Sequence, residues 1–166
     1  MNLAQSLLSE LQHEAANTRK MLERIPAEKF NFKPHEKSMT MMRLAAHIAE
    51  IPGLFIGHVL DTPELDFAIM RYTPATAETT EELLQIFDQS LLKAVEALKA
   101  ASEEEFSKTW TLRNGEHVIL SRSKIGVIRS LGLNHVIHHR GQLSVYLRLE
   151  DLPVPGMYGP SADEMF

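Results

Sequence analysis

Apolar side chains recur at helical spacing over four long stretches of this chain. Residues three and four positions apart lie on one face of a helix, so this spacing indicates four amphipathic helices that each bury an apolar face. The stretches run from Leu3 to Arg24, from Ser38 or Thr40 to about Leu60, from Thr79 or Thr80 to about Ala101, and from Ser121 to Glu150. The pattern therefore predicts an all-α fold, a four-helix bundle.

The period changes from helical to alternating just before the fourth helix. Apolar residues alternate with polar ones on both sides of the pair Asn114-Gly115, which is a strong signal for a β-hairpin. We expect Trp110 to anchor the packing of this hairpin. The hairpin then connects the third and fourth helices.

Other connections carry weaker signals. Pro52 lies inside the second helix and predicts a kink there, because proline removes one backbone hydrogen bond. The segment 61–79 is irregular and apolar, and we expect it to cover one side of the bundle or a pocket. In the Pro- and Gly-rich tail, Ser161 is expected to begin a final helical turn.

Length and composition fit one globular domain spanning residues 1–166. Apolar residues make up 44% and charged residues 23% of the 166 residues. The net charge of −5 argues against a nucleic-acid partner, which usually selects a basic face. No apolar run reaches the roughly 20 residues that span a membrane, and the N-terminus lacks signal-peptide features. A cytoplasmic protein with a small-molecule partner is therefore expected.

Histidines form the clearest candidate site. His135 and His139 are one turn apart on one face of the fourth helix, and His47 lies on the inward face of the second helix. The chain has no cysteine, so a metal site would use His, Asp or Glu. Three imidazoles suit a divalent ion of the zinc or nickel type. His138 lies at the edge of the face and is the weaker ligand candidate.

Two further interpretations of these histidines stay open. They can be core residues that form hydrogen bonds with their neighbours and bind no metal. They can also hold a structural metal in a bundle with a binding or stress-response role. A structural zinc site normally has four protein ligands, whereas a catalytic site keeps one position open.

Three segments of the chain resemble the DinB-like family of bacterial damage-inducible proteins, which are metal-binding four-helix bundles. These segments are Ser38 with 44–47 (Leu-Ala-Ala-His), 134–143 (Asn-His-Val-Ile-His-His-Arg-Gly-Gln-Leu) and 153–163, which includes Tyr-Gly-Pro-Ser-Ala-Asp. The resemblance covers nearly the whole chain. It places the family's three-histidine metal site on His47, His135 and His139.

The resemblance also implies two kinds of chemistry. Some relatives are similar to thiol-dependent S-transferases, which use a low-molecular-weight thiol as cosubstrate, and others to metal-dependent hydrolases. Either activity would act on a small electrophilic substrate at the metal. The family is often dimeric, so a homodimer is expected, and a second apolar stripe at Leu133, Val136 and Leu147 suits either internal packing or a dimer interface.

Three polar residues near the histidines, Gln142, Tyr146 and Glu50, are candidates for supporting roles. Gln142 and Tyr146 follow the histidines on the same helical face and can orient a ligand or donate a hydrogen bond. Glu50 is three residues from His47 and is the nearest candidate for a general base; as an alternative, it is a solvated helix charge. Arg140 points away from the pair and is expected to form a structural salt bridge or a dimer contact.

Overall fold

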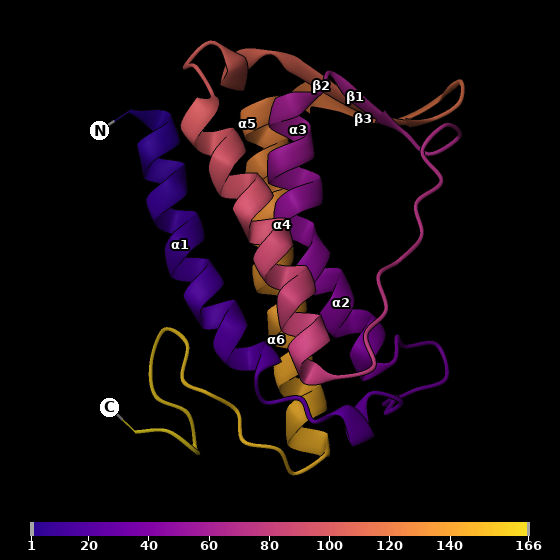
Figure 1. Cartoon of the computed structure of the whole chain (residues 1–166), viewed down its shortest axis with the longest axis vertical. Coiled ribbons are helices and arrows are strands. Elements are labelled where there is room, and N and C mark those ends of the chain that lie inside the picture. Colours follow the sequence, from indigo (N-terminus) through magenta and orange to yellow (C-terminus); the bar gives the residue numbers. More distant parts are fainter. Residues whose placement is uncertain (1, 166) are drawn as a thin grey trace.

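The computed structural model describes residues 2–165, in which four helical rods pack side by side (Figure 1). The first rod is α1 (Leu3–Leu22) and the third is α4 (Thr80–Ala100). The second joins α2 (Met41–Pro52), the π-helical turn η2 (Gly53–Gly57) and α3 (His58–Asp61), and the fourth joins α5 (Lys124–Val127), the π-helical turn η4 (Ile128–Leu133) and α6 (Asn134–Leu149). The predicted all-α four-helix bundle is confirmed.

Side chains at the helix starts explain where three rods begin. The Asn2 side chain accepts from the Gln5 amide and the Gln5 side chain accepts from the Asn2 amide, which closes a capping box before α1. Thr40 caps α2 by accepting from the amide of Arg43, and Thr79 caps α4 in the same way. Of the two capping residues considered for each of these helices, the threonines at 40 and 79 hold the position.

A small sheet closes one end of the bundle. The predicted hairpin is present as β2 (Thr109–Asn114) and β3 (His117–Ser123), paired antiparallel. Its turn has a positive φ of 60° at Gly115, the first central residue, which glycine adopts without strain. A third strand, β1 (Glu64–Asp66), pairs parallel with β2 inside a segment expected to be irregular. Three residues are too few for a periodic pattern.

The predicted start of the fourth helix at Ser121 was wrong. Ser121 does not belong to the fourth helix, because it pairs with Thr111 in the sheet. The helix begins after Ser123, whose hydroxyl makes no capping bond. Lys124 is buried there and donates to the Leu60 carbonyl and the Glu105 carboxylate.

The expected helical turn at the tail is not formed either. The Ser161 hydroxyl accepts from the amides of Asp163 and Glu164, but the chain makes a bend and no helix follows. The remaining short elements are the 3-10 turns η1 (Ala27–Lys29) and η3 (Glu105–Ser107).

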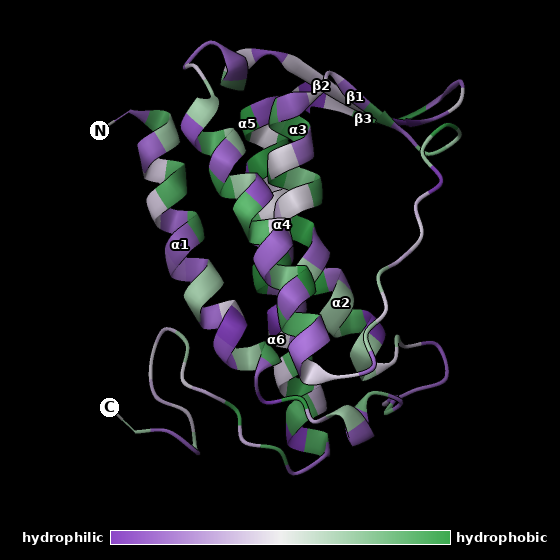
Figure 2. Ribbon diagram, viewed as in Figure 1, coloured by the Kyte–Doolittle hydropathy of each residue, from purple (hydrophilic) through white to green (hydrophobic). Residues whose placement is uncertain are grey.

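The apolar faces of the rods form the core (Figure 2). Trp110 is fully buried under the sheet, as the packing role predicted. Leu133, Val136 and Leu147 are buried within the chain, so the second stripe of the fourth rod serves internal packing.

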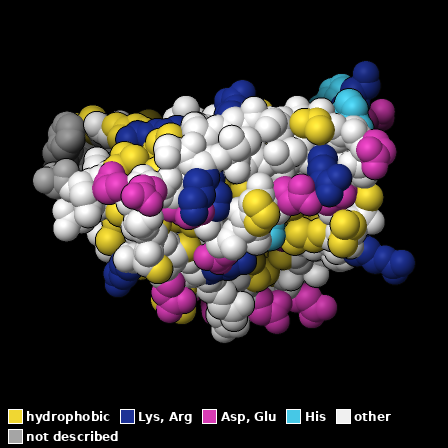
Figure 3. Space-filling model, turned by 90° about the horizontal axis from the view of Figure 1, so that it is seen from above, with side chains coloured by type: hydrophobic (Ala, Val, Ile, Leu, Met, Phe, Trp, Pro, Cys, Tyr) yellow, Lys and Arg dark blue, Asp and Glu magenta, His cyan; other side chains and the backbone are white. Residues whose placement is uncertain are grey.

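On the face seen from above, acidic and basic side chains are interspersed (Figure 3). Within residues 2–165, no helix has the length and apolar character needed to cross a membrane.

Candidate metal centre

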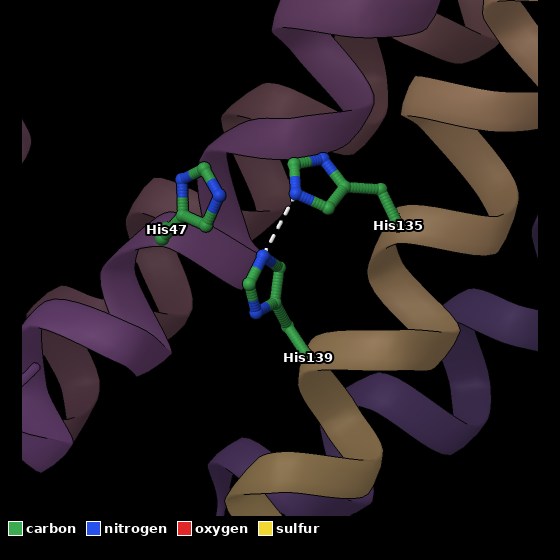
Figure 4. A group of neighbouring side chains, drawn as sticks. All are labelled: His47, His135 and His139. Atoms are coloured by element: carbon green, nitrogen blue, oxygen red, sulfur yellow. Dashed lines mark hydrogen bonds between the residues drawn. The ribbon is translucent and has the colours of Figure 1, made fainter. Parts of the chain in front are cut away.

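Three histidine rings from two rods converge on one point. His47 comes from the middle of α2, and His135 and His139 are one turn apart on α6 (Figure 4). One nitrogen from each ring lies within 4.8 Å of the others. The ring centroid of His47 is 5.1 Å from that of His135 and 4.8 Å from that of His139. The structure thus brings together the three ligands predicted from the sequence.

All three rings are held neutral. Burial, together with charge on His139, His135 and Arg43, lowers the pKa of His47 to about 4. Burial also lowers the pKa values of His135 and His139. A neutral imidazole offers the nitrogen lone pair that a metal ion needs, so no proton has to be removed first at pH 7.

Gln142 sets the tautomer of His139. The Gln142 amide oxygen lies 2.7 Å from Nδ1 of His139, and an amide oxygen only accepts, so Nδ1 carries the proton. The other nitrogen, Nε2, then presents its lone pair toward Nε2 of His135 at 2.8 Å. A partner of this kind orients metal-binding histidines in known sites. This contact agrees with the prediction that Gln142 orients a ligand residue.

The donor set fits a divalent metal ion. Nδ1 of His47 and Nδ1 of His135 are buried, and neither has a hydrogen-bond partner among the described residues. Buried polar atoms without partners are rare in folded proteins. The two facing Nε2 atoms lie 2.8 Å apart, and an ion would replace that contact with two nitrogen ligands. Three neutral imidazoles suit zinc or nickel.

The two π-helical turns position the rods that carry these histidines. Pro52 has no N–H, and the Ser90 hydroxyl of α4 donates to the Glu50 carbonyl and accepts from the Gly53 amide at this break. The turns pack against each other: a Cβ on Gly132 would lie 2.8 Å from Cγ1 of Ile56. The second rod therefore does not end at Pro52, because it continues through the wider turn η2 into α3.

A cavity of about 420 Å³ opens beside His139. Tyr146 lies in its wall, where its hydroxyl donates to the Met39 carbonyl at 3.1 Å and its ring meets Phe32 edge-on. The residues that line the cavity are Lys37, Ser38, Met39, Leu44, His139, Gln142, Val145 and Tyr146. Two of the three predicted supporting residues, Gln142 and Tyr146, thus border one cavity with His139, a candidate metal ligand.

Glu50 has a different environment. Its carboxylate accepts from the Tyr72 hydroxyl at 2.8 Å and from the Ala75 amide at 2.9 Å, and Arg43 lies 3.5 Å away. These contacts fasten the segment 61–79 to α2, so this segment covers one side of the bundle as expected. Tyr72 was not singled out in the sequence, because its partner is 22 residues away.

The other candidate side chains separate clearly. Arg140 is buried and forms an ion pair with Glu14 of α1, so its predicted salt bridge is confirmed. His138 is exposed, in keeping with its weaker candidacy. Glu14 itself was missed, because a charge on an amphipathic helix usually faces water and only the tertiary contact shows its burial.

Comparison with known proteins places the chain in a family. A model of the DinB family matches residues 1–165, so this protein belongs to the DinB family. Bacillus subtilis YrdA is 26% identical over 157 residues, which cover 95% of this chain and 89% of that protein.

Solved structures confirm the fold. A DinB-like protein from Bacillus cereus superposes with a TM-score of 0.71 at 23% identity, covering 93% of this chain and 97% of that one. A more distant structure, the mycothiol-dependent maleylpyruvate isomerase, gives a TM-score of 0.51 at 12% identity. This comparison covers 86% of the present chain and 58% of the isomerase chain.

Proposed function

We propose that this protein is a metal-dependent enzyme that joins a low-molecular-weight thiol to a small electrophile. One divalent cation, zinc or nickel, would be held by His47, His135 and His139. The observation that carries the proposal is the convergence of three neutral imidazoles beside a cavity of about 420 Å³. Cavities of a few hundred Å³ are the usual size of small-molecule sites.

Three protein ligands suit a catalytic role better than a structural one, because structural zinc sites usually have four. When bound, the cation would act as a Lewis acid that stabilises a thiolate or a deprotonated water. The chain's own residues would orient the ligands and the substrate. Gln142 would keep the proton of His139 on Nδ1, and its exposed amide NH2 group would be available to a substrate.

The cavity favours thiol transfer over hydrolysis. Lys37 and Tyr146 line it, while Glu50 does not line it and accepts hydrogen bonds from Tyr72 and Ala75. A thiol loses its proton near pH 8.5 and needs less help from a protein base than water does. The fold likeness to a mycothiol-dependent enzyme supports the same choice.

The reaction balances without a redox partner. The thiol sulfur would form a bond to the electrophilic carbon, and the leaving group would depart with the electron pair of the broken bond. The thiol proton would pass to solvent. Lys37 would attract an anionic group on the thiol or the electrophile toward this cavity.

Metal analysis of tag-free protein tests the site first. We expect about one equivalent of zinc or nickel in the wild type, and little in the His135→Ala variant. The His138→Ala variant is the matched control, because His138 is the exposed neighbour on the same helix. Equal metal contents in wild type and His135→Ala, or no uptake on titration with Zn²⁺ or Ni²⁺, would reject the metal centre.

A thiol-consumption assay tests the reaction. The metal-loaded protein is incubated with a panel of small thiols and an activated halide, and loss of free thiol is compared between wild type and His47→Ala. Wild-type activity that disappears in His47→Ala supports the proposal. Ester or amide hydrolysis without thiol use would support the hydrolase instead. A melting temperature lowered by EDTA with neither activity would indicate a structural metal.

The homodimer is part of the same proposal. Light scattering of the metal-loaded protein should then give twice the 18.8 kDa mass of one chain. A mass equal to one chain would contradict the dimer and leave the metal centre unaffected, because all three candidate ligands come from one chain.

A further inference from the structure

A second cavity lies between α2, η2, α4 and the segment around Tyr72. Its volume is about 450 Å³. Its lining residues are Glu50, Gly53, Leu54, His58, Met70, Arg71, Tyr72, Thr73, Ser90 and Lys93, and none of these lines the cavity beside His139. The two spaces are therefore separate candidate sites.

The charge of this second cavity is positive. Arg71 and Lys93 line it, and neither forms an ion pair or side-chain hydrogen bond within residues 2–165. The only carboxylate in the wall is that of Glu50, whose charge is balanced by Arg43 and by hydrogen bonds from Tyr72 and the Ala75 amide. The charges of Arg71 and Lys93 are therefore available to an anionic ligand.

His58 adds a polar atom without a partner. Its Nε2 is buried and has no hydrogen-bond partner among the described residues. Burial lowers the pKa of this ring, and the Lys93 charge lowers it further, so the ring is neutral near pH 7. A neutral ring nitrogen can accept from a hydroxyl or amine that enters the cavity.

The walls of the cavity are already fixed in position. The Lys93 stem lies across Gly57, where a Cβ would come within 2.8 Å of Lys93 Cγ. The Ser90 hydroxyl is fastened to the backbone of α2 at Gly53. The Tyr72 hydroxyl holds the covering segment to Glu50. The backbone that carries the wall is therefore held before binding, and the exposed Arg71 and Lys93 side chains are the groups that binding would order.

We propose that this cavity binds a small organic acid that carries a hydroxyl or amino group next to its carboxylate. The carboxylate would lie between Arg71 and Lys93, and the hydroxyl or amine would donate to a ring nitrogen of His58, which lines the cavity. This site is independent of the metal centre.

An amide-shift titration tests the proposal on the full-length protein. Malate is added to ¹⁵N-labelled protein in phosphate-free buffer, with dimethyl malate as the uncharged probe and succinate as the probe without a hydroxyl. We expect malate to shift the amides of Gly53 and Gly57 with one-site saturation. The amide of Gly141, on the metal-centre helix, should not move. Dimethyl malate should leave all three unshifted.

Charge-removing variants locate the binding. Lys93→Gln and Arg71→Gln should each weaken malate binding about tenfold or more, because each removes a charge-assisted hydrogen bond. Lys99→Gln is the matched control: Lys99 is exposed on the same helix and does not line the cavity. His58→Leu should abolish the preference for malate over succinate.

Several results would overturn the proposal. These are no shift at Gly53 and Gly57, a shift at Gly141 alone, or equal binding of malate and dimethyl malate. Equal affinities in Lys93→Gln and Lys99→Gln would also reject it. If inorganic phosphate binds at this cavity and malate does not, the site selects an inorganic anion and the organic-acid proposal is wrong.

Discussion

Arg140 Nη2 donates to the Glu14 carboxylate across 2.6 Å, and both side chains are buried between α1 and α6. The same guanidinium donates to the Glu14 carbonyl and to the Thr18 hydroxyl. Tyr158 of the tail donates to Glu14 at 2.7 Å and contacts Arg140. Hydrogen bonds thus join the first rod, the tail and the residue next to His139, with Glu14 and Arg140 buried and Tyr158 exposed.

Removing Glu14 should therefore destabilise the protein strongly. We expect Glu14→Ala to lower the free energy of unfolding by about 3–5 kcal/mol, because it leaves the Arg140 charge buried and unpaired. The measurement is urea unfolding followed by circular dichroism. Glu10→Ala is the matched control, because Glu10 lies on the same helix as Glu14 and forms a surface ion pair with Arg129 of η4. Loss of this surface pair should lower the free energy of unfolding by less than about 1 kcal/mol. Equal effects in the two variants would contradict the buried ion pair of Glu14 and Arg140.

Gln142 should control metal affinity without binding the metal. Gln142→Leu removes the acceptor for Nδ1–H of His139, so the ring loses the contact that fixes its tautomer. We expect affinity for Zn²⁺ to fall about 10–100-fold, the usual effect of losing such a partner. Competition with a chromogenic chelator measures it. Asn134→Leu, at an exposed position on the same helix, should bind like the wild type; unchanged affinity in Gln142→Leu would refute the orienting role.

The metal-free protein should lose stability on mild acidification. His47 has a pKa of about 4 in the folded state and 6.5 in its ordinary range, so between these values the unfolded chain binds a proton that the folded chain does not. The free energy of unfolding should therefore decrease as pH falls from 6.5 toward about 4. Urea midpoints across this range should vary less in His47→Gln than in the wild type. His138→Gln, at an exposed site, should follow the wild-type curve.

Two glycines in the fourth rod should respond oppositely to alanine. At Gly132 a Cβ would lie 2.8 Å from Ile56 Cγ1, so Gly132→Ala should cost about 1–3 kcal/mol of unfolding free energy through overpacking. At Gly141 a Cβ would meet nothing within 4 Å, so Gly141→Ala should add about 0.5–1 kcal/mol through helix propensity. Thermal melts of both variants measure the contrast. A destabilised Gly141→Ala would indicate that a second chain covers this face.

Much of the fold could be predicted because its signals are local. Helical spacing of apolar residues, the threonine caps and the Asn114-Gly115 turn act over a few residues, so they specify four rods and a hairpin without tertiary information. The spacing of His135 and His139 is local in the same sense, because one helical turn places both rings on one face. The inward position of His47 on the second helix then added it to the pair, and the family motifs pointed to the same three residues.

Other features depend on contacts between distant segments. β1 exists only because residues 64–66 pair with residues 111–113, and the fourth rod begins late because Ser121 is taken into the sheet. Glu50 faces Tyr72 and Ala75 instead of solvent for the same reason. Reading a helical face from the sequence also assumes a constant number of residues per turn. The wider turns η2 and η4 have more residues per turn, so they rotate the buried face midway along two rods.

The sequence by itself determined the helical rods, the caps of the second and third rods and the identity of three candidate ligands, since periodicity and residue chemistry are properties of short segments. The tertiary structure alone decided that the three rings meet within 4.8 Å, that Gln142 fixes one of them and that Glu14 is buried against Arg140. Those relationships depend on how the rods pack. Packing is set by side-chain volumes across the whole core, which no local pattern contains.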